Sequence, residues 1–250
     1  MFFEKINSVL DRDEWRMTPQ TVNAYFMPTQ NEIVFPAAIL QPPFCHRSRE
    51  TIDFDIEEEL QMEPNLDVIT PCNYGGIGAV IAHEITHGYD DKGRKFDANG
   101  NLNDWWKAED TELFKKKTDL MVKSVSKYIF VDPENGQEYT MNPQLTMGEN
   151  LADLGGLSLS LKALNKKLEQ EQVSENFKKA SQRVFLKSWA SIWRQNIKKE
   201  RRVLLLTTDP HGPTDFRGNL VQHLDIFYDI FDINQNDNMF LEPENRMTMW

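Results

Sequence analysis

The alternation of apolar and polar positions along the chain predicts a mainly helical protein with a small amount of strand. Apolar residues recur at helical spacing over residues 1–14, 75–90, about 104–127, 147–168 and 174–199. Asp104 and Ser174 stand where N-caps of the third and fifth of these helices are expected. Residues 21–35 alternate instead and are broken by Pro28 and Asn31, which predicts a β-hairpin or two strands. Turn signals follow at residues 97–100 and 133–136. We therefore expect one α+β domain over residues 1–250.

One segment stands apart by its charge. Between Thr51 and Ala82 there is no lysine or arginine, and seven acidic residues fall there. We expect an acidic insertion at about residues 45–72 that forms a solvated, mobile loop; attraction of basic substrates is the alternative. Cys45 and Cys72 bracket this segment, and two cysteines are too few for a disulfide scaffold. A single disulfide at its base and two free thiols both remain open.

Composition and charge exclude several classes of protein. The formal net charge is −11, from 28 basic and 39 acidic residues, which argues against nucleic acid as a partner. No run of about twenty apolar residues predicts a membrane span, and the first residues lack the apolar core of a signal peptide. No Asn-x-Ser/Thr sequon occurs. If the chain is full-length, these features favour the cytoplasm.

The strongest chemical signal is His83-Glu84-Ile85-Thr86-His87, which follows an apolar run over residues 77–82. Residues four apart lie on one face of a helix, so His83 and His87 can direct two imidazole nitrogens at one point. Glu84 lies beside that point. This is the H-E-x-x-H zinc pattern, with two ligands and a general base. A chance match on a surface helix is the alternative, but the apolar flanks argue against it, because burying three polar residues without a function is costly.

A catalytic zinc site needs a third protein ligand. The metzincin pattern fails, because Asp90 and Gly93 occupy the positions where it requires glycine and a third histidine. A later helix offers Glu149 and Asp153, four residues apart on one face. We expect one of the two to bind the metal and the other to accept the N–H of a ligand histidine.

Two further features surround this expected site. Asp90 and Asp91 follow His87 by three and four residues, so either is placed to hold its imidazole. Gly155 and Gly156 are unfavourable inside a helix. They indicate close packing against the helix predicted over residues 75–90, called the zinc helix below. Alternatively, they mark the end of their own helix.

Several segments, in this order, resemble the neprilysin family of zinc metallopeptidases, which includes endothelin-converting enzyme and bacterial oligopeptidase O. They are residues 22–25 (VNAY), 35–44 (FPAAILQPPF), 73–78 (NYGGIG), 83–87 (HEITH), 148–153 (GENLAD), 209–211 (DPH), 216–217 (FR) and the terminal Trp250. The resemblance implies a thermolysin-like zincin domain of gluzincin type. It also implies that the family's N-terminal helical cap domain is absent from this chain, and that relatives often face the cell exterior from a membrane.

The resemblance assigns roles to individual residues. It implies that His83, His87 and Glu149 hold one Zn²⁺ per chain, that Glu84 and Asp153 serve catalysis, and that His211, oriented by Asp209, stabilises the oxyanion. It further implies that Arg217 binds a substrate carbonyl and that Asn23 and Ala24 pair with the substrate backbone. The implied pocket for the residue after the scissile bond consists of Ile39, Phe44, Val80, Ile192 and Trp193. The alternatives are that His211 is an ordinary loop histidine, that Arg217 forms an exposed salt bridge and that the five apolar residues only pack in the core.

The expected function is therefore a zinc metalloendopeptidase that cleaves oligopeptides on the amino side of hydrophobic residues. Two alternatives stand beside it. One is a zinc-dependent peptide-binding module without catalysis, and the other is a fragment that needs its missing half. In each case the absent N-terminal region, or a partner, is expected to cover the active site.

Overall fold

The computed structural model describes residues 11–250, so the helix predicted over residues 1–14 falls largely outside the described residues. The helices are α1 (Glu57–Met62), α2 (Ile69–Asn73), α3 (Ala79–His87), α4 (Ala108–Ser126), α5 (Pro143–Gln170), α6 (Glu175–Ile192), α7 (Lys199–Thr208), α8 (Thr214–Gly218) and α9 (Asp225–Phe231). The strands are β1 (Tyr25–Met27), β2 (Glu32–Val34), β3 (Ile129–Val131) and β4 (Glu138–Thr140). The described part of the chain is mainly helical, as the apolar pattern predicts.

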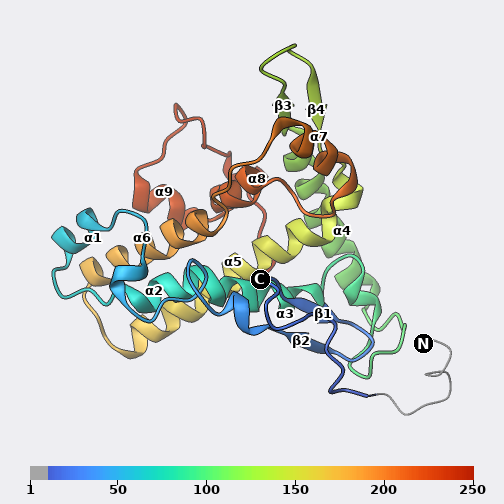
Figure 1. The fold of residues 1–250 in the computed structure, drawn as a ribbon, viewed down its shortest axis with the longest axis horizontal. Helices are drawn as coiled ribbons and strands as arrows, with labels where there is room; N and C mark the ends of the chain where they lie inside the picture. Colours follow the sequence, from blue (N-terminus) through green and yellow to red (C-terminus); the bar gives the residue numbers. More distant parts are fainter. Residues whose placement is uncertain (1–10) are drawn as a thin grey trace.

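The long helix α5 lies at the centre of the fold (Figure 1). Its N-cap, Asn142, accepts hydrogen bonds from the backbone N–H groups of Gln144 and Leu145. Hydrophobic side chains from its C-terminal half pack with α6, whereas Leu151 and Leu154 pack with α4 and the C-terminal segment. Because α5 is buried on several sides, its residues hold fixed positions relative to most other helices.

Helix α3 packs antiparallel against α5. A Cβ added at Gly155 would meet the Thr86 side chain at 2.4 Å, and one added at Gly156 would meet the backbone nitrogen of His83 at 2.7 Å. One turn further along α5, Ser160 donates a hydrogen bond to the carbonyl of Tyr74 at 2.6 Å. The two glycines therefore mark close packing of the zinc helix, and α5 continues well beyond them.

The zinc helix is longer than predicted. Helix α2, a π-helical turn over Tyr74–Gly78 and α3 follow one another without a break. The π-helical turn coincides with the glycine-rich NYGGIG sequence, where the missing side chains allow neighbouring backbone to approach. The carbonyl of Phe44 accepts a hydrogen bond from the Ile77 N–H at 2.7 Å there.

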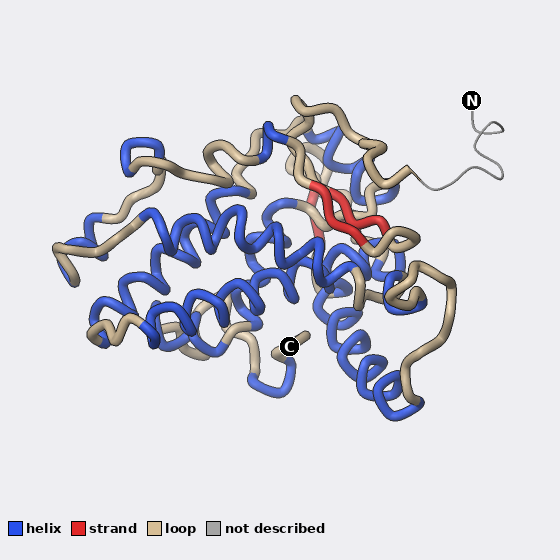
Figure 2. Tube along the Cα trace, turned by 90° about the horizontal axis from the view of Figure 1, so that it is seen from below, coloured by secondary structure: helices blue, strands red, loops and turns tan. Residues whose placement is uncertain are grey.

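Two hairpins flank the helices. Strands β1 and β2 pair antiparallel in the predicted region, with Tyr25 opposite Val34 and Phe26 opposite Ile33, and lie beside α3 (Figure 2). Strands β3 and β4 form a second antiparallel hairpin that surrounds the turn predicted at residues 133–136. This hairpin projects from the helices in Figure 1. Its strands were not predicted. Each has only three residues, and three residues are too few to show an alternation of apolar and polar positions.

Two further predicted helix boundaries are wrong, and one is confirmed. Helix α4 begins at Ala108 with Lys107 at the N-cap, so Asp104 does not cap it. The helix predicted over residues 174–199 ends at Ile192, and α7 begins separately at Lys199. Ser174 caps α6 as predicted, accepting the N–H of Phe177 at 3.1 Å.

The acidic segment contains helix α1 and is folded onto the protein, so the prediction of a loop is wrong, although five of its seven acidic residues are exposed as predicted. Glu59 on α1 has no exposed surface. Its carboxylate lies 2.9 Å from Nε of Arg183 and 2.7 Å from Nζ of Lys187, both on α6. Apolar side chains from the segment pack around Val184 on the same helix. Cys45 and Cys72 are free thiols, and burial raises the pKa of Cys72 to about 11.

A buried histidine ties the C-terminal segment to the core and predicts a pH-dependent stability. His223 is 1% exposed and accepts the Met247 N–H on Nδ1 at 3.0 Å; burial lowers its pKa to about 4. The unfolded chain protonates this histidine near pH 6.5, the folded chain only near pH 4. Between these values the unfolded state binds the extra proton, so we expect stability to fall by about 3 kcal/mol as the pH drops through this window.

The matched variant is His223→Asn, whose side-chain oxygen can accept the same N–H without titrating. Unfolding free energies measured in urea at several pH values between 7 and 4 should fall less steeply for the variant. Identical pH profiles for the two proteins would contradict the role of His223.

Candidate active site

Three side chains of metal-ligand type converge where α3 meets α5. Oε2 of Glu149 lies 3.3 Å from Nε2 of His83 and 3.5 Å from Nε2 of His87. His83 and His87 lie one turn apart on α3, and Glu149 lies on the face of α5 that packs against it. Within residues 11–250, this is the one group of three histidine, cysteine or acidic residues whose ligand atoms gather within 4.8 Å.

The donor atoms fit a zinc ion. Oε2 of Glu149 is buried and has no hydrogen-bond partner, although three imidazole nitrogens face it. The third is Nε2 of His211, at 3.2 Å. A buried carboxylate oxygen without a partner lowers the stability of the fold unless a cation binds to it. Two imidazoles and one carboxylate are a ligand set used by catalytic zinc sites.

His83 and His87 are each held by a carboxylate at the ring nitrogen that faces away from Glu149. Nδ1 of His83 lies 2.8 Å from Oδ1 of Asp153, and Nδ1 of His87 lies 2.7 Å from Oδ2 of Asp90. These contacts direct both Nε2 atoms towards Glu149. The structure thus places Asp153 behind His83 and Glu149 beside the two Nε2 atoms, an arrangement that the sequence left open. It also gives the contact with His87 to Asp90 and not to Asp91, whose Oδ1 is buried without a partner.

Burial and neighbouring charges set the ionisation of the acids. Burial raises the pKa of Glu84, although the charges of His83 and His87 oppose it, and its Oε2 is buried without a partner. Burial also acts on Glu149 and Asp153, but it is outweighed by the imidazoles that face Glu149 and by the guanidinium and imidazole that bind Asp153. His83 and His87 hold the pKa of Glu149 well below its usual range, and Arg217 with His83 lowers that of Asp153 to about 2. Glu84 is therefore the acid in this group best suited to gain a proton.

Arg217 joins the metal-ligand group to the cavity wall. Its guanidinium binds Asp153 with two hydrogen bonds, Nε to Oδ2 at 2.6 Å and a terminal nitrogen to Oδ1 at 2.7 Å. Its other contact is the ring of Trp193, whose centroid lies 3.7 Å from the guanidinium carbon. Trp189, one helical turn earlier on α6, donates its indole N–H to the Arg217 carbonyl at 3.1 Å. Sequence reasoning missed Trp189, although two tryptophans spaced four apart were a usable signal.

His211 faces the same point from the opposite side. Nδ1 of its imidazole lies 2.8 Å from Oδ1 of Asp209, and the same oxygen accepts the backbone N–H of His211 at 2.9 Å. This double contact fixes the ring with Nε2 directed towards Glu149. Asp209 therefore orients the imidazole.

A cavity of about 670 Å³ surrounds these groups. The residues of the expected substrate set that line it are Asn23, Ala24, Ile39, Phe44, Val80, Trp193 and Arg217. Ile192 does not line it; this side chain is buried in the core that α5 and α6 share. Asn23 and Ala24 immediately precede β1, so one wall of the cavity is the start of an edge strand.

Comparison with known proteins identifies the family and the fold. The sequence matches Peptidase family M13 over residues 64–247. The chain belongs to this family. The neutral endopeptidase of Lactococcus lactis subsp. cremoris is 38% identical over 249 residues, which cover 99% of this chain and 34% of that protein. Endothelin-converting enzyme 1 of Rattus norvegicus is 39% identical over 218 residues, 86% of this chain and 25% of that protein.

Solved structures of this family give the same result. The crystal structure of the zinc metalloprotease of Mycobacterium tuberculosis in complex with an inhibitor superposes with a TM-score of 0.84 at 40% identity. The match covers 99% of this chain and 35% of that chain. This M13 chain thus spans about a third of the length of that relative. The neprilysin-type resemblance and the mainly α gluzincin fold are confirmed, and no helix in residues 11–250 is long and apolar enough to cross a membrane.

Proposed function

We propose that this chain is the catalytic part of a zinc metalloendopeptidase that hydrolyses oligopeptides on the amino side of hydrophobic residues. The observation that carries the proposal is the convergence of His83, His87 and Glu149 beside the buried, unpartnered carboxylate oxygen of Glu84. Membership of Peptidase family M13 supports it, as do the relatives described as endopeptidase and zinc metalloprotease.

His83 and His87, through Nε2, and Glu149, through its carboxylate, would hold one zinc ion per chain. Zinc in such a site acts as a Lewis acid and makes a water molecule far more acidic than in bulk solution. Asp153 and Asp90 keep the two imidazoles in the tautomer that leaves Nε2 free. The chain therefore supplies both the ligands and the groups that orient them.

Glu84 is the general base of the proposed reaction. Its carboxylate would accept a proton from the attacking water and then transfer that proton to the leaving amine. Between these two transfers Glu84 is protonated. Burial favours this protonated form, because it raises the pKa of Glu84. Glu149 and Asp153 are held in their charged forms, and Asp91, which also has an unpartnered oxygen and a raised pKa, does not line the cavity.

His211 and Arg217 would recognise the peptide carbonyls. Nε2 of His211, held in place by Asp209, is directed into the cavity. Because Asp209 accepts the proton on Nδ1, the imidazole would donate through Nε2 to the oxyanion of the tetrahedral intermediate in its doubly protonated form. The guanidinium of Arg217 lines the same cavity and would bind the carbonyl of a neighbouring substrate residue. Asn23 and Ala24 would pair with the substrate backbone as an added edge strand.

The apolar end of the cavity supports the proposed specificity. Ile39, Phe44, Val80 and Trp193 line that end, beside Arg217. An apolar side chain placed there leaves water, which favours a hydrophobic residue immediately after the scissile bond. In the longer relatives, about two thirds of the chain lies outside the matched part. We propose that this region, or a partner protein, covers the cavity and limits substrate size.

Removal of the metal tests the proposal directly. A chelator should reduce cleavage of a quenched peptide with phenylalanine after the scissile bond by at least about a hundredfold, because the Lewis acid is lost. One equivalent of Zn²⁺ should restore the rate. The readouts are the zinc content of the protein and the increase in peptide fluorescence. Full activity in the chelated protein would refute the metal dependence, whereas bound zinc without cleavage of any peptide would favour the binding module.

A further inference from the structure

A second cavity adjoins the catalytic one. Its volume is about 460 Å³. The side chains that line both cavities are Trp193, Gln195, Ile197, Arg202, Thr214 and Asp215. At this shared boundary the Gln195 side chain donates a hydrogen bond to Oγ1 of Thr214 at 3.0 Å. The second cavity thus shares Trp193 with the apolar end of the catalytic cavity.

The lining of the second cavity favours an apolar occupant. Its walls include Leu186 and Ala190 from α6 and Phe227 and Phe231 from α9. A cavity of this composition gains most from an aliphatic or aromatic side chain.

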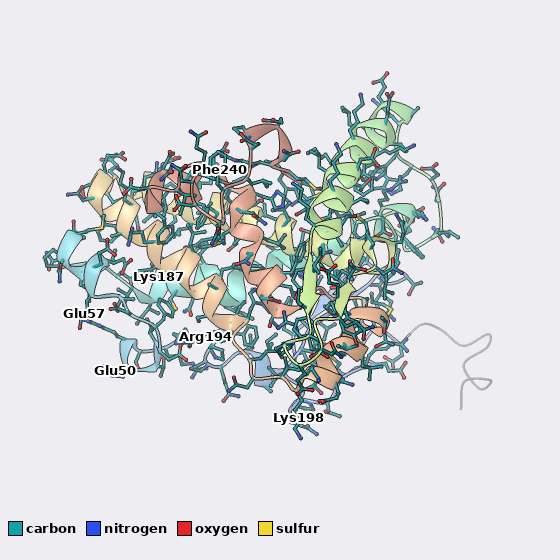
Figure 3. All side chains as sticks on the ribbon, turned by 90° about the horizontal axis from the view of Figure 1, so that it is seen from above. Glu50, Glu57, Lys187, Arg194, Lys198 and Phe240 are labelled. Atoms are coloured by element: carbon teal, nitrogen blue, oxygen red, sulfur yellow. The ribbon has the colours of Figure 1, made fainter. Side chains whose placement is uncertain are left out.

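The cations around the second cavity do not form an anion site, because each is paired with a carboxylate. Lys187 pairs with Glu59, and Arg202 and Arg194 pair with Asp215 and Asp53. Figure 3 labels Lys187 and Arg194, which lie along α6 and just beyond its end. A negatively charged ligand would therefore have to compete with an existing ion pair at every one of these positions.

The edge strand fixes the direction in which a substrate would approach this cavity. Ala24 packs with Ile39 at the apolar end, whereas the ring of Phe26 lies beside Gly88 at the C-terminal end of α3. A peptide that pairs antiparallel with β1 has its C-terminal half next to Ala24. The residues after the scissile bond therefore run towards Trp193 and the second cavity.

The alternation of side chains along an extended peptide indicates which of those residues reaches the second cavity. Side chains two positions apart point to the same face, roughly 7 Å from each other. If the first residue after the scissile bond occupies the apolar end, the third faces the same side, beyond the shared wall at Trp193. We propose that the second cavity binds an apolar side chain at the third position after the scissile bond. This subsite rests on the proposed peptidase function and extends it to longer substrates.

Binding of uncleaved peptides by the Glu84→Gln protein tests the subsite without turnover. Two fluorescein-labelled peptides would differ only at the third position after the expected cleavage site, with leucine in one and the equally shaped asparagine in the other. We expect the leucine peptide to bind at least about tenfold more tightly, measured by fluorescence anisotropy, because an amide loses hydrogen bonds in an apolar cavity. Equal affinities would overturn the subsite.

A substitution that fills the second cavity tests whether the preference for the leucine peptide arises there. Ala190 is exposed, lines the second cavity and lies outside the catalytic one. Adding Ala190→Trp should weaken the leucine peptide to the level of the asparagine peptide, which should itself be unchanged. The control is Ala163→Trp, at an exposed position of α5 that lines neither cavity. A leucine preference that survives Ala190→Trp would place the subsite elsewhere, and binding of neither peptide by Glu84→Gln would remove the proposed function and the subsite together.

Discussion

Replacement of Glu84 by glutamine is expected to reduce peptide hydrolysis by about a thousandfold or more while leaving the zinc content unchanged. General acid–base catalysis is typically worth a factor of about a hundred to ten thousand. The amide has nearly the shape of the carboxyl group but cannot accept the proton of the attacking water. The ligands His83, His87 and Glu149 are untouched, so metal binding should persist. Initial rates with a quenched peptide and zinc per chain are the two measurements.

The control for this variant is Glu112→Gln, an exposed glutamate on α4 whose contact is a 3.6 Å ion pair with Lys116. This change should leave both the rate and the zinc content as they are, because an exposed pair contributes little. If Glu84→Gln cleaved the peptide as fast as the unaltered protein, Glu84 would not be the base. Loss of zinc in the variant would instead indicate that Glu84 helps to form the metal site.

Gly156→Ala is expected to destabilise the protein by about 3 kcal/mol, because one methyl group forces two helices apart. Its Cβ would lie 2.6 Å from the carbonyl oxygen of Ala79 and 2.7 Å from the backbone nitrogen of His83. Backbone atoms cannot move aside by rotating a side chain, so α3 itself must shift. For a chain of this length we expect a drop in the melting temperature of roughly 10 °C. Thermal unfolding followed by circular dichroism measures it.

Gly218→Ala provides the matched control. Gly218 has ordinary helical backbone angles, and its added Cβ would meet nothing nearer than a Trp193 carbon at 3.9 Å. This substitution should change stability little or raise it slightly, since alanine restricts the unfolded chain. Similar melting temperatures for the two variants would show that the contact between α3 and α5 can relax, contrary to the prediction.

The candidate site could be predicted further than the fold around it. His83, Glu84 and His87 are fixed by helical spacing alone, since residues one turn apart share a face. Glu149 and Asp153 also share a face, so spacing could not say which of them approaches the histidines. That choice depends on where α3 crosses α5, and it is made by the glycine contacts in the folded structure.

The regions that were predicted wrongly depend on contacts between distant parts of the chain. Glu59 is one of seven acids in a stretch without cations, which is typical of a solvated loop. It is buried because Arg183 and Lys187, more than 120 residues later, neutralise it. Similarly, the amphipathic pattern of α6 identifies its buried side chains but does not show which of them also reach the cavity, as Trp189 does and Ile192 does not.

In the proposed enzyme, the carboxylate of Asp153 would link zinc binding thermodynamically to peptide binding. One oxygen, Oδ1, contacts both Nδ1 of His83 and a guanidinium nitrogen of Arg217. A peptide carbonyl that draws on Arg217 changes how strongly Asp153 supports His83, and hence the affinity for zinc. Linkage is reciprocal, so zinc must change the affinity for the peptide by the same factor. A substitution that alters the peptide preference through Arg217 therefore also alters how firmly the metal is held.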